Sequence, residues 1–79
     1  MERQQMIEKM RDILSDEFEV EKELILEDAP LMSTLELDSL DVVDMVVLIE
    51  KHFGLKMSKQ DFSEIRTFGN LYDFVGSKL

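Results

Sequence analysis

One serine of this 79-residue chain, Ser39, stands among acidic residues where an irregular stretch gives way to a strongly periodic one. A serine hydroxyl can act as a nucleophile, or it can cap the start of a helix. A nucleophilic serine needs a base within hydrogen-bond reach, and the only histidine is His52. His52 lies along the same expected helix, roughly 20 Å away for a rise of about 1.5 Å per residue. The sequence therefore argues against a serine hydrolase and leaves helix capping as the simplest role for Ser39 taken alone.

The chain is strongly acidic. It carries 18 Asp and Glu against 9 Lys and Arg, a formal net charge of −9. This charge repels nucleic-acid phosphate and anionic lipid, so we expect basic protein partners, no nucleic acid and no membrane insertion. No segment approaches the roughly 18–20 uncharged apolar residues that span a membrane, and the charged N-terminus lacks the apolar core of a secretory signal. The expected location is the cytoplasm, or an organelle matrix after processing.

The length allows one small domain, residues 1–79. The chain has no Cys, which excludes disulfides, thiolate metal ligands and a cysteine nucleophile. A domain this small buries only about 60% of the surface that its unfolded chain exposes, which leaves little room for a deep catalytic cavity. We therefore expect a monomeric binding or carrier module with no enzymatic activity and no metal site.

Apolar periodicity predicts a helix on each side of the irregular stretch. Over residues 3–18 the stripe consists of Met6, Ile7, Met10, Ile13 and Leu14. Over residues 38–53 the stripe consists of Val42, Met45, Val46, Ile49 and Phe53. Asp38 is suited to cap the second of these helices, Asp41 to complete a capping box, and Gly54 to end the helix.

The remaining residues predict further helices and one long connection. Residues 19–37 are too apolar for a solvated linker, and Pro30 interrupts any long helix, so we expect a connection packed over the core with at most a short helical turn. Ser58 and Thr67 can each cap a helix, the first of them short. The predicted fold is all-α: a small antiparallel four-helix bundle, three main helices plus one short helix, with a long first loop.

The second helix presents an unusual outer face. Leu40, Asp44 and Val47 lie at three- and four-residue steps, turned away from the buried stripe. Apolar side chains framed by carboxylates suit a docking surface on which charge orients the encounter. The alternative is that Leu40 and Val47 pack beneath the long connection.

At these residues the chain resembles the acyl carrier proteins of fatty-acid and polyketide synthesis. The close match runs from D-S-L-D at 38–41 through the periodic helix to E-K-H-F-G-L at 50–55, and a looser one follows at 67–75. The resemblance implies that a separate phosphopantetheinyl transferase attaches a 4′-phosphopantetheine arm from coenzyme A to Ser39. The thiol of that arm would hold acyl groups as thioesters, which fits a chain without Cys because the reactive sulfur belongs to the cofactor.

The resemblance also implies a partner surface and an acyl-chain pocket. Acyl-transferring and condensing enzymes with basic docking patches would meet the second helix in brief contacts. The residues expected at that contact are Asp38, Leu40, Asp41, Asp44, Val47 and Glu50. The residues expected to line an acyl-chain pocket between the helices are Met45, Val46, Ile49, Phe53, Ile65 and Leu71.

Two positions depart from the family's pattern. Glu36 stands where the family usually has glycine, and Lys51 stands where an acidic residue is common. We expect Glu36 to change the backbone before Ser39 and Lys51 to weaken the negative face, and both favour a specialised pathway over primary fatty-acid synthesis. An aminoacyl or D-alanyl carrier, and an unmodified acidic module that binds a basic partner, are the alternatives.

Overall fold

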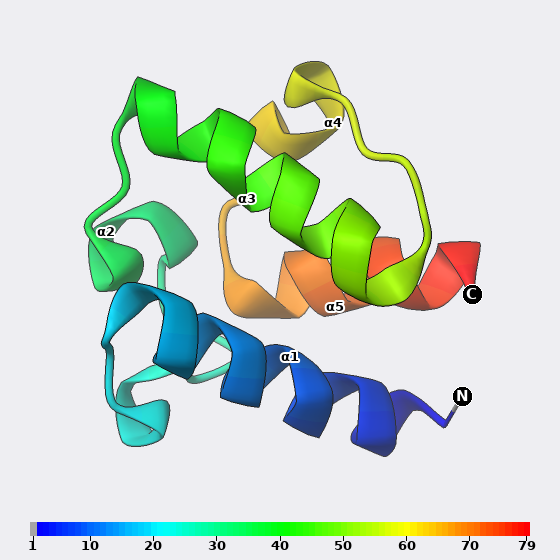
Figure 1. Ribbon diagram of the computed structural model, residues 1–79. Coiled ribbons are helices and arrows are strands. Elements are labelled where there is room, and N and C mark those ends of the chain that lie inside the picture. The colour runs from blue at the N-terminus through cyan, green and yellow to red at the C-terminus, as the bar shows by residue number, and fades with distance from the viewer. Residues whose placement is uncertain (1) are drawn as a thin grey trace.

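The long helices form where the apolar periodicity predicts them (Figure 1). The computed structural model describes residues 2–79, and no strand occurs in that range. In chain order the elements are α1 (Arg3–Phe18), a 3₁₀ turn η1 (Lys22–Leu24), α2 (Leu31–Leu35), α3 (Ser39–Phe53), α4 (Lys59–Ser63) and α5 (Phe68–Lys78). The all-α class, the three main helices and the short α4 are confirmed. The predicted turn in the long connection proves to be two short elements, η1 and α2.

The apolar stripes of the three long helices meet in one core. Its members from these helices are Met6, Met10 and Leu14 of α1, Met45 and Ile49 of α3, and Phe68, Leu71, Tyr72 and Val75 of α5. Val42, Val46 and Phe53, expected within the buried stripe, pack against this core but stay half-buried. Figure 1 shows α3 and α5 running in the same general direction and α1 running against both, which makes the bundle antiparallel.

Local sequence signals determine where the helices begin and end. Asp38, Ser58 and Thr67 each cap a helix as predicted, and each capping box is completed three residues later. Gly54 ends α3 with a φ of 69°, in the left-handed region that glycine adopts without strain.

The long connection is held against the start of α5 by backbone hydrogen bonds. Gly69 N donates to Glu27 O at 2.9 Å, Phe68 N donates to Ala29 O at 3.3 Å, and Leu31 N donates to Arg66 O at 2.9 Å. Within the connection, Ile25, Leu31 and Leu35 are buried in the core. The connection therefore packs over the core as expected, and its fixed course determines where the chain enters α3.

Candidate functional site

The connection delivers Ser39 as the first residue of α3. Asp38, and not Ser39, caps the helix: its Oδ1 accepts from Leu40 N at 2.9 Å and from Asp41 N at 3.1 Å. Asp41 Oδ2 accepts in return from Asp38 N at 3.1 Å. Ser39 is exposed, and no hydrogen bond engages its hydroxyl among residues 2–79. The simple capping role for Ser39 is therefore wrong, because the neighbouring carboxylate performs it.

The capping box also sets the charge at this helix start. The backbone N–H groups of Asp41 and Leu40 that point at the Asp38 carboxylate lower its pKa below the ordinary 3.8, because they stabilise the ionised form. Asp38 is therefore ionised at neutral pH, where it complements the positive end of the α3 dipole.

Glu36, which ends α2, has a left-handed backbone with φ 54° and ψ 47°. Glycine adopts this conformation freely, whereas a residue with a Cβ does so at a steric cost. Glu36 thus has a backbone conformation that glycine adopts freely. The presence of glutamate in place of glycine at position 36 therefore causes local backbone strain.

The outer face of α3 is open to solvent. Leu40 is 77% exposed, Val47 is 57% exposed, and Val43, which the sequence reasoning did not include, is 41% exposed. The alternative in which Leu40 and Val47 pack beneath the connection is therefore wrong. Asp44 and Glu50 are exposed as well, so carboxylates frame this apolar face.

The six residues expected around an acyl chain lie within or against the core. Met45, Ile49, Leu71 and Ile65 are buried, and Val46 and Phe53 are half-buried. Of the six, Ile65 also lines a cavity of about 260 Å³ that opens at the surface. The other residues that line this cavity are Met32, Val42, Lys59, Phe62 and Ser63. Sequence reasoning missed them as pocket residues, although Val42 belongs to the predicted buried stripe of residues 38–53.

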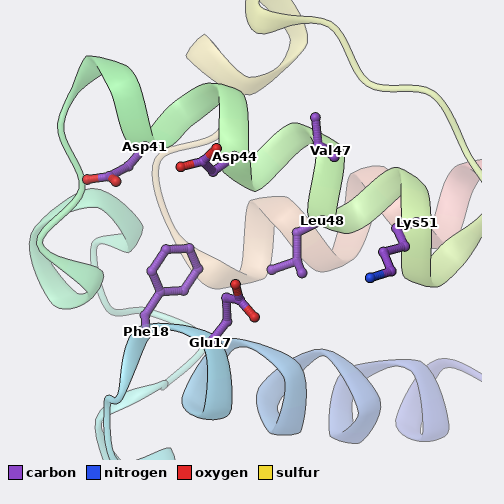
Figure 2. Close-up of a pocket in the computed structure, with 7 residues that line it drawn as sticks. All are labelled: Glu17, Phe18, Asp41, Asp44, Val47, Leu48 and Lys51. Atoms are coloured by element: carbon purple, nitrogen blue, oxygen red, sulfur yellow. The ribbon is translucent and has the colours of Figure 1, made fainter.

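A second hollow lies between the end of α1 and the outer side of α3 (Figure 2). It measures about 580 Å³ and is lined by Glu17, Phe18, Asp41, Asp44, Val47, Leu48 and Lys51. Periodicity could not have found it, because α1 and α3 supply its walls from distant parts of the sequence. Among residues 2–79 no group of three or more His, Asp or Glu is arranged to hold a metal ion.

Comparison with known proteins agrees with this arrangement. Residues 8–75 match the protein family described as "Phosphopantetheine attachment site". A relative named acyl carrier protein, from Coprothermobacter proteolyticus, is 35% identical over 79 residues, which cover 100% of this chain and 96% of the relative. The chain belongs to the acyl carrier protein family.

Two further acyl carrier proteins show similar coverage. The one from Thermotoga maritima is 34% identical over 77 residues, 98% of this chain and 95% of the relative. The one from Lactobacillus acidophilus is 30% identical over 77 residues, 98% of this chain and 96% of the relative. As a member of the acyl carrier family, the chain is a carrier and not a catalyst, its cofactor is covalent 4′-phosphopantetheine, and it works with biosynthetic enzymes.

The start of α3 fits that cofactor. An exposed hydroxyl in the first helical turn can be esterified without unfolding the core, and the positive end of the helix dipole favours the negative charge of a phosphate. Figure 1 shows the start of α3 at a corner of the molecule, away from the helix crossings. No helix among residues 2–79 has the length and apolar character to cross a bilayer.

Proposed function

We propose that Ser39 is the residue that carries 4′-phosphopantetheine and that a separate phosphopantetheinyl transferase attaches it. The observation that carries this assignment is the exposed hydroxyl of Ser39, which makes no hydrogen bond among residues 2–79 because Asp38 supplies the cap. Four of the other serines use their hydroxyls in hydrogen bonds; these are Ser15, Ser58, Ser63 and Ser77. Ser33 on α2 is exposed and makes no such bond in the described range, so it is the natural control.

The attachment replaces the Ser39 O–H bond by an ester bond between Oγ and the phosphorus of the arm. Adenosine 3′,5′-bisphosphate leaves coenzyme A, and the proton passes to a base of the transferase. The base is external because His52 sits at the other end of α3, about 20 Å along the helix. When attached, the arm supplies the thiol that holds acyl groups, while Asp38 keeps the first turn of α3 in place.

We propose that partner enzymes dock on the outer face of α3. The contact residues are Asp38, Leu40, Asp41, Asp44, Val47 and Glu50. Exposed carboxylates attract a basic patch over a distance, and the small apolar area of Leu40 and Val47 permits rapid release. Lys51 on the same helix reduces the negative charge, which supports partners of a specialised pathway.

We also propose that the acyl chain enters at the cavity beside Ile65 and extends toward Met45, Val46, Ile49, Phe53 and Leu71. The position of this cavity supports its role as the entrance for the acyl chain. Ile65 and Phe62 line the cavity and also belong to the core, so the cavity adjoins the interior. The buried members must separate to admit a chain, and the unbranched side chain of Met45 is suited to such repacking.

Intact-mass measurement after incubation with coenzyme A and a broad-specificity transferase tests the assignment of Ser39. The wild-type chain should gain the mass of one phosphopantetheine, Ser39→Ala should gain none, and Ser33→Ala should gain one. A wild-type chain that gains no mass, or a gain that survives Ser39→Ala, would contradict the proposal.

A further inference from the structure

The cavity beside Ile65 has apolar walls and a single cation. The walls consist of four apolar side chains, those of Met32, Val42, Phe62 and Ile65. The two other lining residues are Lys59, which is the first residue of α4, and Ser63. No carboxylate of residues 2–79 lines this cavity, although the chain has 18 acidic against 9 basic residues. The charge at the cavity is therefore opposite in sign to that of the molecule as a whole.

Lys59 is the hydrogen-bond donor that this cavity offers to a bound molecule. The side chain is exposed and forms no ion pair within the described range 2–79. The carboxylate nearest to it along the chain, that of Asp61, accepts from Ser58 N at 3.1 Å in the capping box of α4. Ser63 donates its hydroxyl hydrogen to Gln60 O at 2.6 Å and has no other hydrogen to donate. The ammonium group of Lys59 therefore favours an anionic oxygen at this cavity.

The cavity is small and close to Ser39. Val42, which lines it, follows Ser39 by about one helical turn, roughly 5 Å along α3, on the same side of the helix. The volume of about 260 Å³ lies just below the range of roughly 300–1,000 Å³ that is typical of small-molecule pockets. A short acyl group on an arm at Ser39 thus matches the size of the cavity, whereas a long chain requires the core to open.

The overall charge makes the position of Lys59 selective. A carboxylate added to a chain of net charge −9 increases the repulsion within the folded state where no cation lies near it. At the cavity, the ammonium group of Lys59 offsets this repulsion, and the methylene stem of the same side chain adds apolar surface. A short carbon chain with a free carboxylate at its end matches both properties.

We propose that this cavity holds a short acyl group that ends in a carboxylate, and that Lys59 is the specificity-determining residue that binds this carboxylate. The inference rests on the proposed attachment of the arm at Ser39 and names the class of cargo, the half-thioester of a short dicarboxylic acid. The phosphate of the arm is an anion too, so the experiment compares arms with and without a carboxylate.

The test is the thermal unfolding of the full-length chain after a broad-specificity transferase has loaded it from coenzyme A, butyryl-coenzyme A or succinyl-coenzyme A. Butyryl and succinyl groups have the same number of carbons, and only the succinyl group has a free carboxylate. Lys59→Gln should lower the Tm of the succinyl form by about 1–5 °C more than that of the butyryl form, the effect of losing one surface ion pair in a domain of this size.

Lys56→Gln is the matched control, because this exposed lysine makes the same charge change outside the cavity. It should change the Tm of the succinyl and butyryl forms equally. A selective loss that Lys56→Gln reproduces would mean that only the net charge matters, and it overturns the proposal.

The unacylated form separates the two anions. If Lys59→Gln lowers the Tm of the unacylated, butyryl and succinyl forms equally, relative to the apo-chain, Lys59 binds the phosphate and the proposal is wrong. No effect of Lys59→Gln on any form overturns it as well, while the assignment of Ser39 stands. Intact mass identifies a wild-type chain that takes up no arm, and that result overturns both.

Discussion

The first turns of α3 and α5 are both stabilised by a capping box, but the two helix starts have different surroundings. Each has a capping box, Asp38 with Asp41 and Thr67 with Asn70. At α5, however, the carbonyls of Glu27 and Ala29 accept from the first amides, and Phe68 is fully buried. At α3 no loop of residues 2–79 makes such backbone hydrogen bonds to the first amides, and Ser39 stays exposed. The same kind of cap thus lies at a buried helix start in α5, where the connection covers it. In α3 it lies at an exposed helix start, where Ser39 is accessible for modification.

The largest expected effect on stability comes from disrupting the contact between the start of α5 and the long connection. At Gly69 an added Cβ would lie 2.8 Å from Glu27 Cγ and 3.1 Å from Glu27 O, and Gly69 N is hydrogen-bonded to that oxygen. Gly69→Ala should therefore lower the free energy of unfolding by about 1–3 kcal/mol, since it pushes the connection away from α5.

Gly76→Ala in the same helix is the control for this prediction. Its nearest neighbours would lie at 3.6 and 3.7 Å, which is ordinary contact. That variant should gain about 0.5–1 kcal/mol, because alanine favours helix more than glycine does. Urea unfolding of both variants measures the difference, and equal midpoints would show that the connection does not constrain Gly69.

A smaller effect, a gain in stability, is expected at Glu36, just before the exposed start of α3. Glu36→Gly should raise the stability by about 0.5–1 kcal/mol, since relief of the left-handed strain exceeds the entropy gained by the unfolded chain. Glu19→Gly at the end of α1, where φ is 55°, should give a similar gain. Thermal unfolding should show each gain as a rise in Tm of about 2–8 °C.

Loading distinguishes the two glutamates further. Glycine can keep the left-handed backbone that Glu36 has, so transferase loading of Glu36→Gly should match the wild type. Slower loading of Glu36→Gly, with normal loading of Glu19→Gly, would show that the Glu36 side chain itself contacts the enzyme.

The smallest expected effect is the loss of the Asp38 cap of α3 at low pH. The Asp38 carboxylate has a lowered pKa, so its cap stabilises the folded chain above the ordinary value of 3.8 and is lost as the pH falls through the lowered value. The box of Thr67 and Asn70 contains no titrating group, so the start of α5 should resist the same change.

Amide hydrogen exchange during acidification measures this contrast. Protection of Leu40 and Asp41 should fall before that of Asn70, and Asp38→Asn, whose amide oxygen does not titrate, should remove the step at α3. Simultaneous loss at both helix starts would mean that acid unfolds the chain globally and that the caps play no separate part.

Sequence patterns were sufficient to predict the main helices and to identify Ser39 as the candidate modification site. Periodicity identified α1 and α3, and the capping residues marked where α3, α4 and α5 begin, because these signals act within a few residues of the chain. The D-S-L-D segment also pointed to Ser39 through its resemblance to the carrier family. The sequence predicts a short helical turn in the connection but not its place, because the five residues of α2 between Pro30 and Glu36 carry too little periodicity to locate one.

What the sequence by itself determined is the set of helices and the acidic first turn that presents Ser39. Tertiary structure alone decided which helix start is covered, since the hydrogen bonds between the connection and α5 join residues about forty positions apart. It also decided that Glu17 and Phe18 of α1 face Asp44 and Leu48 of α3. Local propensities act over a turn or two of chain, whereas such contacts depend on how the whole core packs.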